Sequence, residues 1–288
     1  MRKTVLLPAV AVAGGIAGLV IRQFYLASAF EPVTGLPVSG APTAYAMWAI
    51  TLLVFAAVIA LSLGRHRTFD RCYTRAFGTS SLPLRAGCLA GAVLLLLAGI
   101  FNIAAEPTAP VILTPLARIA SILRPVLGAF CLAAAAGIWF VMQKMGSGKP
   151  VQSVWPQLPG FACCFWIIAN YQGWAQDPAL PRYLFVLAAT LLSMAACLLL
   201  AGFAYEKGRV TAALIVSLLA VTLNIMVLGD GLALGDLAIH LAMVFYLLSM
   251  SCTLLVNDAK PEPPAAPVTC GGSCQGCPGC GGTPGNNT

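Results

Sequence analysis

The chain has 288 residues, of which 59% are hydrophobic and only 9% are charged, and its mean hydropathy is +0.89. Because soluble domains carry roughly 25% charged residues, this composition excludes a soluble globular protein and indicates an integral membrane protein. The net charge of +7 does not indicate a nucleic-acid partner, since most of the lysines and arginines lie beside apolar segments, where membrane topology accounts for them.

The first apolar run covers residues 4–21 and follows two basic residues. It has two interpretations: the core of a signal peptide cleaved near residues 27–29, or a retained first membrane span. Gly14 and Gly18 form a small-xxx-small packing pattern, and Arg22 separates the run from the cleavage site. We therefore expect a retained helix.

Seven further apolar segments follow, so the sequence predicts an all-α, polytopic transmembrane bundle of about eight spans. A hydrocarbon core about 30 Å thick needs roughly 20 helical residues for each span. The bundle forms one domain over residues 1–256, and a tail occupies residues 257–288. We place the spans at residues 4–21, 44–63, 86–105, 125–142, 159–171, 183–205, 210–228 and 237–256.

Two local patterns refine the third and fourth spans. Gly87 and Gly91 again place small residues one turn apart, which predicts close packing against a neighbouring helix. Thr114 and Pro115 have the pattern of a helix N-cap followed by proline at the first helical position. We expect this lead-in to continue, with a kink at Pro125, into the fourth span.

An arginine-rich segment over residues 64–85 sets the orientation. It holds five arginines against one acid, so the positive-inside rule places it in the cytoplasm. Twelve of the sixteen lysines and arginines then fall inside, and the four outside are Arg22, Arg118, Arg124 and Arg182. We therefore predict that both chain ends are cytoplasmic and that the protein lies in a plasma (inner) membrane.

The same arginine-rich segment contains a helical pattern. Arg67, Arg71 and Arg75 recur every four residues, while Tyr73 and Phe77 project to the opposite side. This spacing predicts a short amphipathic helix on the inner leaflet, with its apolar side in the acyl boundary and its guanidinium groups toward anionic lipid headgroups. Phosphate-bearing ligands are the less favoured alternative.

Several polar residues near the outer helix ends are candidates for a ligand site. Asp236 and His240 share a helix face at i, i+4, and Asp230 is expected at a similar depth. Arg118 and Arg124 lie outside against the positive-inside bias, and ionisable groups near a membrane usually have a partner. The alternative interpretation is interfacial snorkelling of long side chains. The predicted ligand site comprises Glu106, Arg118, Arg124, Asn224, Asp236 and His240.

The interior of the spans carries few polar groups. Asn224 is the residue that we expect to form an interhelical hydrogen bond. No Asp, Glu, Lys or Arg falls at the centre of a span, so the carboxylate relays of many proton-coupled transporters are not expected. Uniport and passive conduction stay open.

Four cysteines in the glycine-rich tail follow the spacing Cys-x3-Cys-x2-Cys-x2-Cys. Their thiolates suit a soft metal, so Zn, Cu(I) or an iron-sulfur centre is the expected cofactor, and a reducing cytosol disfavours structural disulfides. The alternative is a low-complexity tail that binds metal adventitiously or exchanges thiols. The tail is expected to be disordered unless something binds it. The predicted ligands are Cys270, Cys274, Cys277 and Cys280.

The remaining features do not indicate an enzyme. Seven other cysteines are scattered, mostly within spans, where free cysteine behaves as a small hydrophobe. The chain has two histidines and no HExxH, P-loop, GxGxxG or nucleophile-elbow motif. We expect small-solute membrane transport. The alternative is a non-enzymatic membrane sensor or scaffold whose cytoplasmic cysteine tail responds to metal or redox state.

Overall fold

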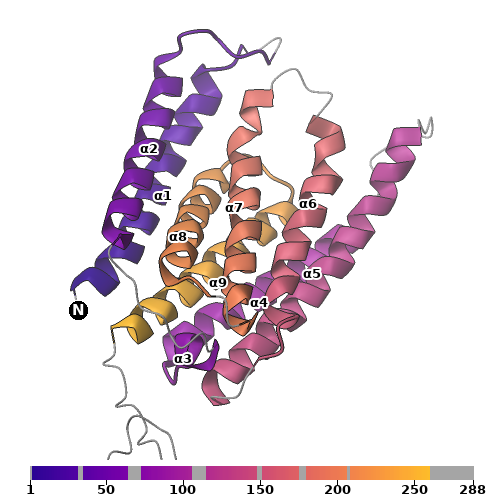
Figure 1. Cartoon of the computed structure of the whole chain (residues 1–288). Helices are drawn as coiled ribbons and strands as arrows, with labels where there is room; N and C mark the ends of the chain where they lie inside the picture. The colour runs from indigo at the N-terminus through magenta and orange to yellow at the C-terminus, as the bar shows by residue number, and fades with distance from the viewer. Residues whose placement is uncertain are drawn as a thin grey trace, which may run out of the picture.

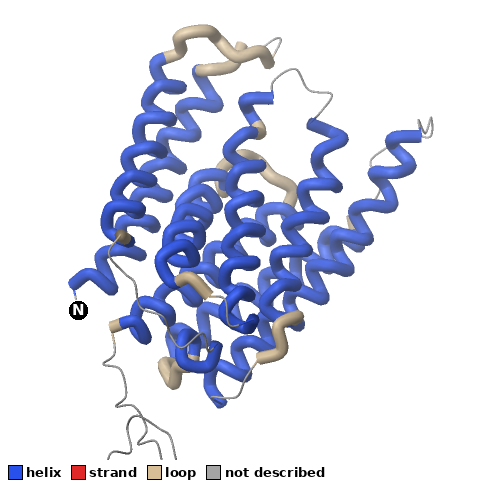
Figure 2. Tube along the Cα trace, viewed as in Figure 1, coloured by secondary structure: helices blue, strands red, loops and turns tan. Residues whose placement is uncertain are grey.

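The computed structural model describes residues 2–31, 35–63, 73–105, 115–147, 151–174, 180–205 and 208–259. Within these ranges the regular structure is helical, apart from an isolated bridge between Phe30 and Pro37. Figures 1 and 2 show the helices gathered into one bundle. A helix satisfies its backbone polar groups internally, which suits apolar segments that lie in lipid.

Nine α-helices account for most of the described residues. They are α1 (Arg2–Ser28), α2 (Pro42–Ser62), α3 (Tyr73–Phe77), α4 (Leu82–Ala104), α5 (Pro115–Ser147), α6 (Leu158–Trp174), α7 (Leu184–Ala201), α8 (Val210–Val227) and α9 (Leu234–Asp258). Short 3-10 helices lie beside α6 and α7, and these are η1 (Trp155–Gln157), η2 (Leu180–Arg182) and η3 (Gly202–Tyr205).

Seven of the described helices are long and apolar enough to cross a membrane, namely α1, α2, α4, α5, α7, α8 and α9. The described residues therefore confirm the expected all-α architecture, and these seven helices are compatible with a multi-pass membrane protein. The remaining long helix, α6, corresponds to the weak span expected at residues 159–171 and has 17 residues. At about 1.5 Å per residue it extends roughly 26 Å.

The predicted lead-in and fourth span form a single helix in the structure. α5 begins at Pro115, as its sequence pattern indicates, and continues through Pro125 for 33 residues. Arg124 therefore lies inside a long helix, one residue before this proline.

Close packing of α1 against two neighbours explains its small residues. A Cβ atom at Gly14 would lie 2.6 Å from the Val54 side chain of α2, and one at Gly18 would meet Met226 of α8. Both glycines of the predicted packing pattern therefore lie at helix contacts, and α1 is part of the bundle.

The glycines of α4 have the same role on the other side of the bundle. A Cβ atom at Gly91 would lie 3.1 Å from the Ala242 carbonyl oxygen of α9. Further along α4, a Cβ atom added at Gly128 of α5 would lie 2.8 Å from the Gly99 carbonyl oxygen. These approaches let α4 lie close to both α5 and α9.

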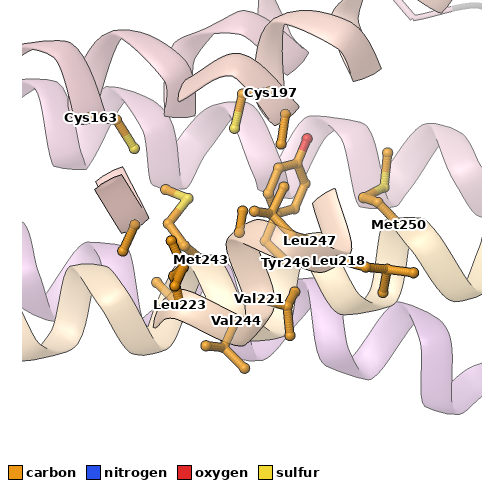
Figure 3. Close-up of a cluster of buried hydrophobic side chains, with 14 of the residues drawn as sticks. Cys163, Cys197, Leu218, Val221, Leu223, Met243, Val244, Tyr246, Leu247 and Met250 are labelled. Atoms are coloured by element: carbon orange, nitrogen blue, oxygen red, sulfur yellow. The ribbon is translucent and has the colours of Figure 1, made fainter. Parts of the chain in front are cut away.

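α8 and α9 form the centre of the bundle. In an 18-residue apolar stretch of each helix, 78% of the residues of α8 and 72% of those of α9 are buried, compared with 22% in α2. Figure 1 shows α1 and α2 at one edge of the bundle and α5 toward the other. Figure 3 shows Cys163 and Cys197 beside apolar residues of α8 and α9, as expected for cysteines that pack as small hydrophobes.

The structure corrects the expectation for the apolar side of the arginine-rich segment. Tyr73 and Phe77 of α3 are buried within the protein, and the Phe77 ring lies 5.2 Å from the Phe203 ring of η3. The apolar side of α3 therefore packs on protein and not in the acyl boundary. A helical projection separates polar from apolar faces, but it does not distinguish lipid from protein as the apolar partner.

The rest of the proposed lipid-binding segment lies mostly outside the described residues. This applies to Arg67 and Arg71, whereas Arg75 is described and exposed. The loop after α3 is fixed to the end of α9, because Asn257 donates hydrogen bonds to the Ala76 and Gly78 carbonyl oxygens at 2.8 and 3.1 Å.

Candidate functional site

A group of polar side chains surrounds Arg124 of α5 at one end of the bundle. Arg124 Nη1 donates to Asp236 Oδ1 of α9 at 2.9 Å. The same nitrogen donates to Asn102 Oδ1 of α4 at 3.1 Å, and Nη2 donates to Asn170 Oδ1 of α6 at 2.9 Å. Side chains from three other helices thus hold one guanidinium group.

The two asparagines are oriented by their own helices. Asn102 Nδ2 donates to the Ala98 carbonyl oxygen at 2.9 Å, and Asn170 Nδ2 donates to the Trp166 carbonyl oxygen at 3.0 Å. Each amide nitrogen donates to a carbonyl oxygen one turn earlier in its own helix, so the amide oxygen is left to face Arg124. This arrangement suits a guanidinium group, which has donors and no acceptor.

Asp236 is more deeply placed than Arg124. Its Oδ1 also accepts a hydrogen bond from Trp166 Nε1 at 2.7 Å, and the residue lies in the first turn of α9, where the helix dipole favours a negative charge. The Asp236 side chain is 6% exposed and that of Arg124 is 32% exposed. The ion pair therefore joins a buried carboxylate to an arginine whose side chain is partly exposed. We define the Arg124 site as Arg124, Asp236, Asn102, Asn170 and Trp166.

A second polar group lies one turn further along α9. His240 Nδ1 lies 2.7 Å from Asn224 Oδ1 of α8, and Asn224 Nδ2 donates to Ser193 Oγ of α7 at 2.7 Å. The Trp166 ring contacts the His240 ring edge-on, with the ring centres 5.2 Å apart. Trp166 therefore contacts both groups. We define the His240 group as His240, Asn224 and Ser193.

The structure brings together four of the six residues predicted for the ligand site. Arg124 and Asp236 are bonded directly, as are His240 and Asn224, and Asn224 forms the expected interhelical hydrogen bonds. Glu106 and the side chain of Arg118 lie outside the described residues.

Sequence reasoning missed three residues of the Arg124 site. Asn102 and Asn170 were recognisable only as polar residues within spans. Trp166 carried a weaker signal, because a buried indole N–H usually has an acceptor, but the sequence does not show which one.

A second buried ion pair was also missed. Arg22 of α1 donates to Asp230 Oδ2 through Nη2 at 2.7 Å and to Oδ1 through Nε at 3.0 Å. Nη2 also donates to the Arg182 carbonyl oxygen at 2.7 Å, and the guanidinium carbon lies 4.8 Å from the centre of the Phe185 ring. Burial raises the pKa of the Asp230 carboxyl group, and the Arg22 guanidinium opposes this shift.

The described cysteines give no support for a metal centre inside the bundle. Six of them are free, and no group of three or more His, Cys, Asp or Glu among the described residues is placed to hold a metal ion. The predicted tail ligands Cys270, Cys274, Cys277 and Cys280 lie outside the described residues. Metal binding by the tail stays a prediction from its sequence.

Metal analysis of the purified protein tests the tail. If the four thiolates form one site, changing all four tail cysteines to serine should remove about one equivalent of bound Zn or Cu, or the two or four Fe of one iron-sulfur cluster. The control changes Cys164 and Cys252, which are partly exposed in the bundle, to serine. Equal metal content in the wild type and the tail variant would contradict the prediction.

Comparisons of the chain with models of protein families, with curated proteins and with solved structures find no match. The chemistry of the Arg124 site and the His240 group is therefore the basis on which a function can be assigned. These polar side chains come from six helices of the described bundle, α4 to α9, and α5 supplies the central cation.

Proposed function

We propose that this protein moves a small polar solute across the membrane and that the Arg124 site binds the solute from the outer side. The observation that carries this proposal is the partly exposed side chain of Arg124 in an ion pair whose acid, Asp236, is buried. Arginine has five N–H donors, and the described partners of Arg124 use three of them. The remaining donors are available to a solute at the exposed part of the side chain.

The hydrogen bonds of Arg124 distinguish this site from simple snorkelling. A snorkelling arginine extends along apolar surface and leaves its charged head in water. Arg124 is instead fixed by Asn102, Asn170 and Asp236, which come from three helices. Fixed donors lose little conformational freedom on binding, which favours recognition of a solute. The His240 group lies beneath the site, on the way into the bundle.

We further propose eight membrane crossings, with α6 as the fifth. Trp155, just before α6, lies against Gly137 of α5, and Asn170, near the end of α6, reaches Arg124 of α5. Residues 124 and 137 are separated by roughly 20 Å along a helix. α6 therefore runs along most of the depth of the bundle.

The proposed orientation places both chain ends in the cytoplasm of a cell bounded by a plasma (inner) membrane. Figure 1 shows the start of α1, the short helix α3 and the last turns of α9 at the same end of the bundle. Two of the four arginines assigned to the outer side, Arg22 and Arg124, lie within helices and form ion pairs. The positive-inside rule concerns residues in loops, so these two arginines do not oppose the orientation.

Solute binding is tested by thermal unfolding of the purified protein with a panel of formate, inorganic phosphate, glycine, glucose and choline. A solute at one hundred times its Kd adds about 2.7 kcal/mol, so we expect one class to raise the Tm by roughly 5 °C or more. Arg124→Gln should abolish the rise. Arg182→Gln, a change of an exposed arginine at the same end, should retain it.

Transport is then measured as uptake of the stabilising solute into vesicles that contain the protein. Wild type and Arg182→Gln should accumulate the labelled solute, and Arg124→Gln should not. The proposal is wrong if no solute in the panel raises the Tm, or if Arg124→Gln shows the same rise as wild type.

A further inference from the structure

We propose that His240 is a buried proton acceptor and that the solute bound at Arg124 is a small anion which crosses together with a proton. This inference rests on the proposed function and adds the class of solute and the coupled ion. It depends on the hydrogen-bond chain of the His240 group and on the charges that surround it.

The hydrogen-bond chain determines which nitrogen of His240 carries the proton. Ser193 Oγ donates to the Ala189 carbonyl oxygen at 2.8 Å, so this hydroxyl must accept from Asn224 Nδ2. The same amide nitrogen also donates to the Ala220 carbonyl oxygen at 2.7 Å. Asn224 therefore presents Oδ1, an acceptor, to His240 Nδ1. The neutral ring carries its proton on Nδ1.

This tautomer leaves a lone pair on His240 Nε2. Within the described residues Nε2 has no hydrogen-bond partner, and the residue is 1% exposed. Buried polar atoms nearly always have partners, so an unpaired one calls for an explanation. A basic nitrogen held without a donor is ready to take up a proton, and histidine is the side chain whose charge ordinarily changes between about pH 5 and 8.

Among the described residues of the two groups, Asp236 is the acid that can balance a proton added to His240. Asp236 lies one turn earlier on the same helix, and its carboxylate accepts from Trp166, whose ring contacts His240. Within the described Arg124 site and His240 group, the charged residues are Arg124 and Asp236. Among the described residues, Trp166 of α6 and Asn224 of α8 contact His240, Ser193 of α7 bonds Asn224, and Arg124 of α5 and Asn102 of α4 bond each other beside Asp236. Cys131, Cys163 and Cys197 are buried thiols on α5, α6 and α7.

The charge balance links the anion to the proton. Without a solute, Asp236 neutralises Arg124, and a proton on His240 would leave one uncompensated positive charge in a buried region. When an anion binds the exposed side of Arg124, the charge of Asp236 becomes available to the imidazolium one turn away. The charges then sum to zero over the anion, Arg124, Asp236 and protonated His240. Binding of the anion therefore favours binding of the proton, and the reverse.

The first experiment reads the His240 ring directly. The chain has two histidines, so protein labelled with 15N-histidine and carrying His66→Gln gives one histidine signal. In MES buffer at neutral pH we expect the pattern of a neutral ring protonated on Nδ1. A ring protonated on Nε2 would overturn the inference, and this measurement changes none of the residues that the structure describes.

The second experiment tests the coupling with formate, inorganic phosphate and chloride as probes, with sodium MES matching the ionic strength. At pH 6 a bound anion should convert the His240 signal to that of the protonated ring. Formate stays charged at these pH values. Its affinity should rise about tenfold for each unit of decrease in pH, over the interval between the pKa of His240 without the anion and its pKa with the anion bound. Arg182→Gln should behave as wild type, and Arg124→Gln should show neither effect.

The outcomes separate this inference from the proposed function. An anion that raises the Tm of wild type but not of Arg124→Gln, with the His240 signal unchanged, overturns proton coupling and leaves solute binding in place. Arg124-dependent binding of glycine, glucose or choline in place of an anion overturns the solute class. If no probe or panel member raises the Tm, both the inference and the proposed function are wrong.

Discussion

Replacing Arg22 with glutamine should lower the free energy of unfolding by about 3 kcal/mol, because the buried Asp230 carboxylate loses its counter-charge. Arg22 is fully buried, and its guanidinium contacts the carboxylate through Nε at 3.0 Å and Nη2 at 2.7 Å. The pair joins α1 to the loop between α8 and α9. Unfolding of the purified protein in mixed micelles, followed by loss of helical circular dichroism, measures the effect.

The adjacent residue offers a matched control for Arg22. Gln23 donates to the Gly229 carbonyl oxygen at 2.8 Å, so it bonds the same loop from the same turn of α1, but it is exposed. Gln23→Ala should therefore cost less than about 1 kcal/mol. Adding Asp230→Asn to Arg22→Gln should restore at least about 1 kcal/mol relative to the sum of the single changes. Equal effects of the Arg22 and Gln23 changes would refute the role of the ion pair.

This ion pair also bears on whether the first helix is retained. Cleavage near residues 27–29 would remove Arg22 and leave Asp230 without the cation that it contacts in the described structure. It would also uncover the surfaces of α2 and α8 that Gly14 and Gly18 allow α1 to approach. The contacts therefore favour the retained helix that its packing pattern predicts.

The positions of the helices could be predicted because they depend on local properties. A span needs an apolar segment of sufficient length, and Pro115 marks the start of α5 through its own preference for the first helical turn. The pairing of Arg22 with Asp230 joins residues 208 positions apart. Such a contact depends on how α1 and α8 pack, and a single sequence does not contain that information.

The candidate site was predictable in part for the same reason. Asp236 and His240 share a face because they are four residues apart in one helix, and the sequence shows this spacing directly. Their partners Arg124, Trp166 and Asn224 come from three other helices, and polarity alone does not show which neighbour each one faces. The sequence therefore predicted the members of the group better than their contacts.

Replacing Gly128 with valine should destabilise the protein by about 2 to 3 kcal/mol and abolish solute binding at Arg124, because it forces α4 and α5 apart. A Cβ atom at Gly128 would lie 2.8 Å from the Gly99 carbonyl oxygen and 3.2 Å from the Ile103 amide nitrogen, and backbone atoms cannot turn away as side chains can. Arg124 lies one turn before Gly128 on α5, and Asn102 lies one turn after Gly99 on α4. The separation should therefore break the 3.1 Å bond between Arg124 and Asn102.

Gly146 provides the control on the same helix, since the three atoms nearest to a Cβ atom there all belong to the end of the Arg85 side chain, with Cζ at 2.8 Å. That flexible group can move, so Gly146→Val should change the free energy of unfolding by less than about 1 kcal/mol and keep the solute-dependent rise in Tm. If Gly128→Val is as stable as Gly146→Val, the close approach of α4 and α5 is not required. If it is destabilised but still binds the solute through Arg124, the bond to Asn102 does not position the guanidinium group for binding.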